Sequence, residues 1–355
     1  MPALAQAAEL PFITPPHGIS SIQPAAPVGA VKGQPGRWSR GLVLALKIGT
    51  AAGCLATFLP FAADFHWGAD LFAHFRVQYL VALTLAAIIL AWRRRFISSG
   101  FAAAGAVINL LFILPHAEAL PVAKPAGKAV RLRCISLNVL QGNKNPAALE
   151  KFLRECEADV IVFQEVTPEI GQILRKLSPI YPGQFLRGRK DSKGAALLTR
   201  LPMRNGRFEP LPGQKTIGAV AAELTTPAGT FTVFGIHSHK PTDQKGAVSQ
   251  RAYFRWLAER CTETHARGTP VILAGDFNST PWSRNLQQLV ADSRLQDTSR
   301  GVLFGATWSY WLPYRLMIDH AFLTPEWQLL ERKIGPGVGS DHRPLILDLA
   351  ISPGR

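Results

Sequence analysis

A carboxylate and an amide follow directly on one apolar stretch in the second half of the chain. The run Gly275-Asp276-Phe277-Asn278 comes after Val271 to Ala274, a stretch typical of a buried strand. Two later clusters, Asp319-His320 and Asp341-His342, place further acids and imidazoles beside apolar runs. Such groups can orient water, bind a metal ion and neutralise charge on a phosphoryl group. We therefore expect phosphate chemistry at these positions.

Eight polar residues share one placement, at or just beyond the end of an expected strand. They are Asn138, Glu165, His237, Asp276, Asn278, Asp319, Asp341 and His342. Taken singly, an Asp or Asn after a strand is more often a turn former or a helix cap, and a lone His is usually a hydrogen-bonded core residue. Their occurrence together in one domain favours a shared rim with a chemical role.

The acids among these residues predict a metal site. Carboxylate oxygens with few soft ligands suit Mg²⁺ or Mn²⁺, which bind one or two protein carboxylates together with phosphate oxygens. Glu165 ends a short apolar strand much as Asp276 does, and it is the leading candidate ligand.

Hydrolysis of a phosphodiester needs a positioned water and neutralisation of the charge that grows on the phosphoryl oxygens. Asp276 could align or deprotonate the water, and Asn278 could donate a hydrogen bond to a phosphoryl oxygen. An acid could orient an imidazole, either in the pair Asp341-His342 or in the pair of Asp319 with His342. Which group is the general base stays open.

The pattern from residue 130 onward alternates strands and helices. Strands are expected at Arg131–Leu140, Asp159–Gln164, Ala195–Thr199, Arg204–Leu211, Gly218–Thr225, Thr230–His237, Val271–Ala274, Ile318–Leu323 and Leu345–Ile351, and helices at Pro146–Glu157, Pro168–Leu177 and Asp243–Arg267. The four strands between Ala195 and His237 suggest an antiparallel meander. Strands in two groups with intervening helices predict an α/β fold of two packed sheets sandwiched by helices.

The first part of the chain has a different character. Three apolar runs, Gly41–Ala63, Val77–Trp92 and Phe96–Leu114, are long enough to read as transmembrane helices. Three in series argue against buried core helices, and the Pro- and Ala-rich residues before the first run argue against a signal peptide. We expect a disordered leader at 1–40, a membrane domain at 41–115, a linker at 116–129 and a catalytic domain at 130–355.

Basic residues predict how the helices are oriented. Lys32, Arg37 and Arg40 precede the first run, and the triplet Arg93–Arg95 links the second run to the third. The positive-inside rule places these segments in the cytoplasm. The chain would then be a multi-pass protein of the cell (inner) membrane, with its catalytic domain on the extracytoplasmic side. Basic residues from Lys124 to Arg133 weaken this inference.

The net charge bears on the class of substrate, and the cysteine content bears on whether a zinc site is expected. The formal net charge is +15, and residues 130–355 carry 29 Lys and Arg against 20 Asp and Glu. A basic domain favours polyanionic substrates, although it is equally a general aid to solubility. The four cysteines form no close pair, so a zinc site is not expected and they are interpreted as small buried residues.

The ordered motifs resemble the endonuclease/exonuclease/phosphatase superfamily, which includes DNase I, repair nucleases of the exonuclease III type, sphingomyelinases and inositol-polyphosphate 5-phosphatases. The resemblance covers Arg131 to Ile351. It rests on Leu137-Asn138-Val139, Gln164-Glu165-Val166, Gly194 to Arg200, Gly235-Ile236-His237-Ser238, Gly275-Asp276-Phe277-Asn278, Ile318-Asp319-His320 and Ser340-Asp341-His342-Arg343-Pro344. Seven motifs in the family's order are stronger evidence than any one of them.

This resemblance implies a four-layered αββα sandwich and metal-dependent hydrolysis of phosphoester bonds. Glu165 would bind Mg²⁺ or Mn²⁺, helped by Asn138 and Asp341. Asp276 and Asn278 would act on the water and the phosphate. His237 would contact the phosphate or act as an acid. Asp319 and Asp341 with His342 would form the base or stabilise charge.

Three residues refine the resemblance. His237 fits the DNase I and sphingomyelinase branch, because the repair-nuclease branch has Tyr at the matching place. Met317 stands where similar membrane-anchored relatives have Arg, which puts one substrate contact in doubt. Trp308 could stack on a base or only pack.

The expected function is that of a membrane-anchored phosphodiesterase, with nucleic acid as the favoured substrate. A phospholipid or inositol-phosphate hydrolase is the alternative within enzymes. A catalytically inactive module that binds a phosphorylated ligand or a protein is the second alternative, and the complete set of polar residues argues against it.

Overall fold

The computed structural model describes residues 37–118, 120, 129–302, 305–309 and 315–352. Most of the expected leader at 1–40 and most of the expected linker at 116–129 lie outside the described residues. Contacts group the chain into Met1–Leu42 and Val43–Arg355, and the second unit holds both the apolar helices and the two sheets.

Three helices are long and apolar enough to cross a membrane, namely Arg40–Ala62, Trp67–Trp92 and Phe96–Ala117. They contain α1 (Arg37–Phe58), η1 (Leu59–Ala62), α2 (Trp67–Asp70), η2 (Leu71–Phe75), α3 (Arg76–Trp92) and α4 (Phe96–Ala117). Of the spans expected from the sequence, Val77–Trp92 and Phe96–Leu114 fall within these segments, and Gly41–Ala63 ends one residue beyond the first. Leu83 of α3 packs on Ala102 and Ala106 of α4. A side chain at Gly105 would meet Leu83 at 2.9 Å, so glycine permits this close approach.

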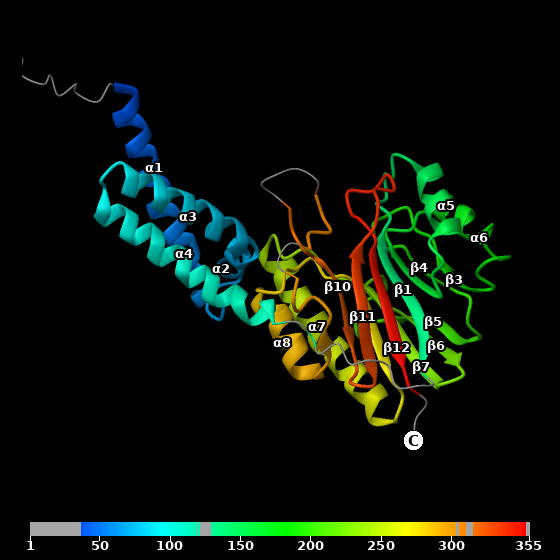
Figure 1. Cartoon of the computed structure of the whole chain (residues 1–355). Helices are drawn as coiled ribbons and strands as arrows, with labels where there is room; N and C mark the ends of the chain where they lie inside the picture. Colours follow the sequence, from blue (N-terminus) through cyan, green and yellow to red (C-terminus); the bar gives the residue numbers. More distant parts are fainter. Residues whose placement is uncertain (1–36, 119, 121–128, 303–304, 310–314, 353–355) are drawn as a thin grey trace, which may run out of the picture. The chain divides into compact units, whose positions relative to one another are not determined.

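The described residues from Val130 to Ile351 contain two six-stranded sheets. The first has the order β11-β12-β1-β2-β4-β3 and contains β1 (Val130–Asn138), β2 (Val160–Gln164), β3 (Gly183–Arg187), β4 (Ala195–Thr199), β11 (Trp327–Ile334) and β12 (Leu345–Ile351). Figure 1 shows β11, β12 and β1 side by side, and β12 pairs with each of the other two in the antiparallel direction.

The second sheet has the order β5-β6-β7-β8-β10-β9. Its strands are β5 (Met203–Pro210), β6 (Gly218–Thr226), β7 (Gly229–His237), β8 (Val271–Asp276), β9 (Gln296–Asp297) and β10 (Asp319–Leu323). The expected four-stranded meander is wrong in one strand. β5, β6 and β7 form it, but β4 pairs with β2 and β3 in the first sheet. The turn around Arg200 carries the chain from one sheet to the other, which the apolar pattern of separate strands cannot reveal.

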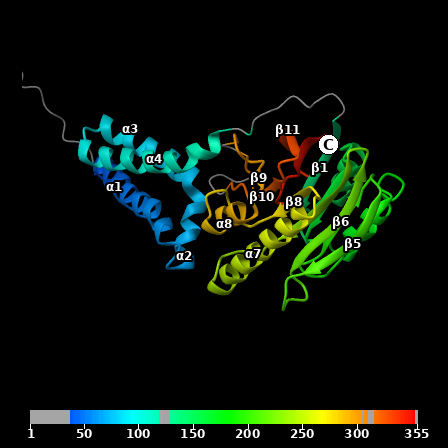
Figure 2. The same ribbon diagram turned by 90° about the horizontal axis from the view of Figure 1, so that it is seen from below.

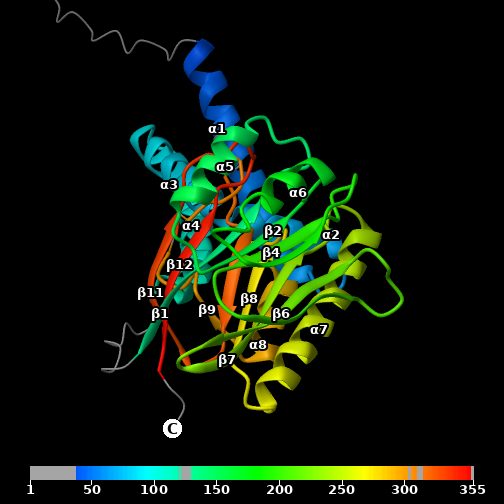
Figure 3. The ribbon, with the colours of Figure 1, turned by 90° about the vertical axis from the view of Figure 1, so that its right-hand side faces the viewer.

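Helices cover the outer face of each sheet. Helices α5 (Pro146–Glu155) and α6 (Pro168–Arg175) pack on the first sheet, and α7 (Gln244–Ala266) and α8 (Arg284–Ser293) pack on the second. Figure 2 shows α7 and α8 along the sheet that contains β8, and Figure 3 shows the two helix pairs on opposite sides.

Between the sheets lies a core built from side chains of both, including Val162, Leu197, Val233 and Ile272. This arrangement confirms the expected four-layered sandwich. The cysteines expected to be small packing residues are free thiols, three of them buried and Cys54 half-buried.

Candidate active site

Each sheet has one parallel pair of strands at its centre, and both pairs end at the same rim. β1 and β2 are parallel, with Asn138 opposite Gln164, the residue before Glu165. β7 and β8 are parallel, with His237 opposite Asp276. The antiparallel neighbour β10 begins at Asp319, which also lies opposite Asp276. The topology thus explains why residues far apart in sequence meet.

Asn138 joins the two sheets at this rim. Its side-chain amide donates to Oε1 of Glu165 and to Oδ2 of Asp276, each at 3.0 Å. Its Oδ1 accepts from the backbone N–H of Leu140 at 3.0 Å, which fixes the orientation of the amide. The N–H of Gln141 donates to Oε2 of Glu165 at 3.1 Å. Asn138 is only 1% exposed, so its three bonds hold two acids in a fixed spacing.

Two of the rim residues have a left-handed backbone. Glu165 has φ 60° and Asn278 has φ 49°. Asn tolerates this region well, but Glu rarely adopts it, and such strain persists only where surrounding contacts impose it. For Glu165 these contacts include Gly194. The carbonyl oxygen of Gly194 accepts a hydrogen bond from the N–H of Val166 at 3.2 Å. A side chain on Gly194 would lie 1.8 Å from the carbonyl oxygen of Val166.

Asp276 is buried and faces two imidazoles. Its Oδ2 lies 3.4 Å from Nε2 of His237 and 3.6 Å from Nε2 of His342, while Oδ1 accepts from the N–H of Asn278 at 2.9 Å. Burial alone would raise the pKa of Asp276, but the two imidazoles and the N–H groups outweigh burial and lower it. Asp276 is therefore held ionised.

His342 lies between two acids. Its Nδ1 is 2.8 Å from Oδ2 of Asp319, so the ring N–H donates to this carboxylate and Nε2 is turned toward Asp276. Burial alone would lower the pKa of His342, but Asp319 and Asp276 raise it to about 9. Of the two pairs left open by the sequence, the structure forms Asp319 with His342.

A hydrogen bond to the loop between β3 and β4 orients the ring of His237. Its Nδ1 lies 3.1 Å from the carbonyl oxygen of Ser192, to which it donates. Nε2 then faces Asp276 and lies 3.9 Å from Oε1 of Glu165. Burial lowers the pKa of His237, although both acids oppose this effect.

Asp341 belongs to the same strand-end region but has a different partner. The indole N–H of Trp308 donates to its Oδ2 at 2.9 Å, and its Oδ1 is buried with no hydrogen-bond partner among the described residues. Trp308 thus orients an acid, a role that the sequence did not suggest. Oδ1 of Asp319 is buried and unpartnered in the same way.

The site fits a hard divalent cation. The residues Glu165, Asp276 and Asp319 are each at most 8% exposed, and burial of a carboxylate is costly unless positive charge is near. Ligand atoms of Asp276, Asp319 and His342 lie within 4.8 Å of one another. This group differs from the set Asn138, Glu165 and Asp341 expected from the sequence. Both sets are rich in oxygen and contain no thiolate, which suits Mg²⁺ or Mn²⁺.

Sequence reasoning missed several supporting residues. Lys193 is half-buried near Glu165 and Asp276; burial lowers its pKa, while these acids oppose that shift. The hydroxyl of Ser340 donates to the carbonyl of Asn138 at 2.7 Å. Lys193 lies in a stretch without regular secondary structure, so no period in the sequence points to it.

Met317, the departure from related sequences, is buried and 5% exposed. Its sulfur lies 3.6 Å from Nη2 of Arg332, whose guanidinium reaches it from β11. Burial lowers the pKa of Arg332 to about 10, although Asp297 and Asp319 oppose this effect. The positive charge of Arg332 therefore lies beside Met317. Arg332 belongs to β11, a strand that was not predicted from the sequence.

Two mixed sheets with a buried cluster of acids and imidazoles at their common rim define a phosphoesterase fold of the DNase I-like class. The sequence matches the Endonuclease/Exonuclease/phosphatase family over residues 135–342, and the chain belongs to this family.

Solved structures share the fold at low sequence identity. Truncated Caenorhabditis elegans TDP2 matches with a TM-score of 0.53 at 12% identity, over 62% of this chain and 97% of that one. An endonuclease/exonuclease/phosphatase from Beutenbergia cavernae matches with a TM-score of 0.51 at 21% identity, over 62% and 72%. The human Nocturnin catalytic domain with a bound sulfate anion matches with a TM-score of 0.50 at 18% identity, over 62% and 95%. No curated protein sequence matches the chain.

Proposed function

We propose that this protein is a membrane-anchored phosphodiesterase that depends on Mg²⁺ or Mn²⁺ and acts on nucleic acid. The observation that carries the proposal is the bridge made by Asn138, which fixes the carboxylates of Glu165 and Asp276 at one rim. Fixed, buried carboxylates beside imidazoles are the arrangement that metal-assisted phosphoester hydrolysis requires.

The metal would be bound by Glu165 with Asn138 and Asp341, or by Asp276 and Asp319, the two acids of the group whose ligand atoms converge. His342 would not bind it while both ring nitrogens carry protons. When bound, such an ion supplies positive charge to the phosphoryl oxygens and lowers the pKa of a coordinated water.

The remaining groups divide the other tasks. Asp276, held ionised by its neighbours, aligns the attacking water or accepts its proton. His342 carries a proton at neutral pH and stabilises negative charge on the phosphate, and Asp319 fixes its orientation. His237 presents Nε2 to the phosphate or to the leaving oxygen.

Asn278 lies beside Asp276 and completes the set. Its side-chain N–H₂ donates to the carbonyl of Ser238 at 3.0 Å and has a second hydrogen for a phosphoryl oxygen. In the free enzyme this bond keeps the amide at the rim.

The basic character of residues 130–355 supports nucleic acid as substrate. One observation favours a phospholipid as the second candidate. A cavity of about 610 Å³ is lined by apolar residues of α3, including Val81 and Leu85, and by Leu316 and Met317 of the catalytic domain. A cavity with a wall formed by a spanning helix could accept an acyl chain.

A substrate panel tests the proposal. The purified full-length protein is offered DNA, RNA, sphingomyelin and inositol phosphates, each with Mg²⁺ and with a chelator. Metal-dependent release of nucleotides supports the proposal, and selective cleavage of sphingomyelin replaces it with the second candidate. No turnover of any member would favour an inactive binding module instead.

We also propose that the catalytic domain lies outside the cytoplasm, because Arg93–Arg95 and the basic residues before α1 mark the cytoplasmic side. A reporter enzyme that is active only outside the cytoplasm, fused after Arg355, should be active. Activity of a cytoplasm-specific reporter at the same position would contradict this orientation.

A further inference from the structure

The loop that carries Asp276 and Asn278 is held at its far end by the turn at the start of the second spanning segment. This loop runs from the end of β8 to the start of α8 at Arg284, and its residues from 276 to 283 are all buried. The turn is made by α2 and η2, which lead into α3. Its contacts reach the loop at Thr280 and Ser283.

His74 of η2 binds the middle of the loop. Its Nδ1 lies 3.1 Å from the backbone nitrogen of Thr280 and 3.1 Å from the hydroxyl of the same residue. A backbone N–H can only donate, so Nδ1 must be the acceptor and the ring proton must be on Nε2. His74 is 6% exposed and Thr280 is fully buried, so loss of this bond would leave a buried donor without its partner.

Asp70 of α2 caps helix α8 from more than 200 positions away in the sequence. Its Oδ1 accepts from the backbone N–H of Arg284 at 2.8 Å, and its Oδ2 accepts from the hydroxyl of Ser283 at 2.9 Å. Ser283 occupies the N-cap position but makes no capping bond of its own, because its hydroxyl donates to Asp70. A carboxylate at a helix N-terminus is also stabilised by the helix dipole.

The catalytic domain fixes the same loop from the other side. Gln250 of α7 donates to the carbonyl of Phe277 at 3.2 Å and accepts from the hydroxyl of Ser279 at 3.3 Å. Nε2 of His320 donates to the carbonyl of Ser279 at 2.8 Å. The loop is therefore positioned by two supports, one from the catalytic domain and one from the membrane segment.

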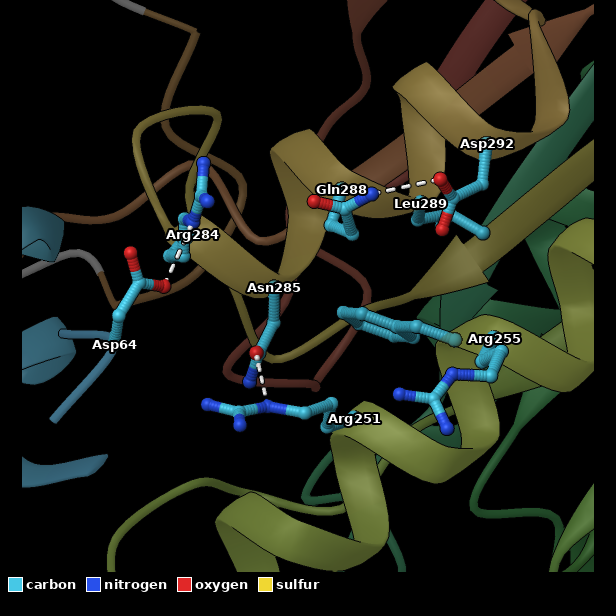
Figure 4. Close-up of a pocket in the computed structure, with 9 residues that line it drawn as sticks. Asp64, Arg251, Arg255, Arg284, Asn285, Gln288, Leu289 and Asp292 are labelled. Atoms are coloured by element: carbon cyan, nitrogen blue, oxygen red, sulfur yellow. Dashed lines mark hydrogen bonds and ion pairs between the residues drawn. The ribbon is translucent and has the colours of Figure 1, made fainter. Parts of the chain in front are cut away.

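An exposed ion pair at the same junction provides a contrast. Asp64 lies 3.1 Å from Nε of Arg284, and Figure 4 shows the two side chains facing each other. Their side chains are 65% and 52% exposed, so this pair contributes little to the position of the loop. The bonds of Asp70 and His74 differ from it because both residues are buried and their partners are backbone N–H groups and the hydroxyls of buried residues.

We infer that Asp70 and His74 are positioning residues of the active site, through which the membrane segment fixes the loop that carries Asp276 and Asn278. The inference rests on the proposed phosphodiesterase function. It means that the membrane segment is part of the catalytic unit as well as an anchor.

The test measures turnover and loop exchange in the full-length protein. Asp70→Ala and His74→Ala are compared with Asp70→Asn and His74→Asn, which keep an acceptor oxygen, and with Asp64→Ala as the exposed control. The substrate is bis(4-nitrophenyl) phosphate with Mn²⁺. Because a misplacement of about 1 Å can cost about 100-fold in rate, we expect the Ala variants to lose about 10-fold to 100-fold in kcat with little change in KM. The Asn variants should recover most of this loss, and Asp64→Ala should retain wild-type kcat.

Hydrogen exchange separates positioning from unfolding. The backbone amides of residues 278–284 should exchange faster in the Ala variants, while those of β1 and β12 keep wild-type protection. Wild-type kcat and wild-type exchange at 278–284 in both Ala variants would overturn the inference. Loss of protection throughout both sheets would also overturn it, because the residues would then support the whole fold. If the wild-type protein hydrolyses no substrate, the proposed function fails, whereas the exchange measurement still decides whether the membrane segment holds the loop.

Discussion

Nδ1 of His342 lies 2.8 Å from Oδ2 of Asp319, and both side chains are buried at the rim where the two sheets meet. Asp319 begins β10, and its backbone is in register with Asp276 of β8. The pairing of these strands therefore places an imidazole with one acid at each of its nitrogens. The register of β8 and β10 thus places both acids that raise the pKa of His342.

Replacing Asp319 by Asn should remove the charge that orients and protonates His342 while leaving a side chain of the same shape. We expect kcat for a phosphodiester to fall by about 100-fold or more, as is usual when an acid-base group loses its partner. Asp292→Asn is the matched control, because Asp292 is exposed on α8 and bonds only Gln288 among the described side chains. Equal rates for Asp319→Asn and the wild type would exclude this role.

The same pair predicts how stability depends on pH in metal-free protein. The folded-state pKa of His342 is raised to about 9 from an ordinary value of 6.5. Its stabilising contribution is therefore complete below about pH 6.5 and is lost as the pH rises through about 9. The thermal midpoint should fall over this interval in chelator, and the fall should be smaller in Asp319→Asn. A midpoint that rises with pH by an equal amount in both proteins would contradict this assignment.

Replacing Glu165 by Gln should weaken metal binding. Metal that binds only the folded protein at 100 times its Kd stabilises it by about 2.7 kcal/mol, so Mg²⁺ or Mn²⁺ should raise the thermal midpoint of the wild type. We expect this shift to be much smaller in Glu165→Gln and unchanged in Glu169→Gln, which alters an exposed acid of α6. The measurement needs no substrate. A full metal-induced shift in Glu165→Gln would remove Glu165 from the metal site.

Replacing Gly194 by Ala should displace the residue that follows Glu165. The added carbon would lie 1.8 Å from the carbonyl oxygen of Val166, so the backbone at Glu165 must move. We expect a loss of stability of about 1 to 3 kcal/mol together with a fall in kcat. Gly171→Ala in α6 is the control, since its added carbon meets nothing within 4 Å and Ala favours a helix. Wild-type stability and kcat in Gly194→Ala would show that the close approach has no role.

The sequence predicted most of the fold because the central strands are continuous apolar runs that end in polar residues. Ala195–Thr199 and Leu345–Ile351, for example, were predicted with the bounds that the structure has. β3 and β11 were missed because they are edge strands with half-buried faces and polar residues along much of their length, as in Gln328 to Lys333. Strands of this kind lack the clear alternation on which the prediction depends.

The candidate residues of the site could be predicted from the sequence, but their hydrogen-bond partners could not. Asn138, Glu165, His237 and Asp276 lie at the end of a strand or directly after it, as predicted, and Asn278 follows two residues after β8. Asp319 instead begins β10, and Asp341 and His342 lie in the segment that leads into β12. The choice of Asp319 as the partner of His342 depends on the antiparallel register of β8 and β10, which no local pattern encodes. The roles of Asp70 and His74 were equally out of reach, since their partners lie more than 200 residues away.

The central claim is that Asp276 belongs to a metal-dependent phosphodiesterase site. It is tested most directly by the rate at which the full-length protein hydrolyses bis(4-nitrophenyl) phosphate, in Mn²⁺ and in chelator, beside the variant Asp276→Asn. The account predicts hydrolysis that stops in chelator and falls by about 100-fold to 10,000-fold in Asp276→Asn. Hydrolysis that persists at the wild-type rate in this variant, or that is indifferent to the chelator, would contradict it.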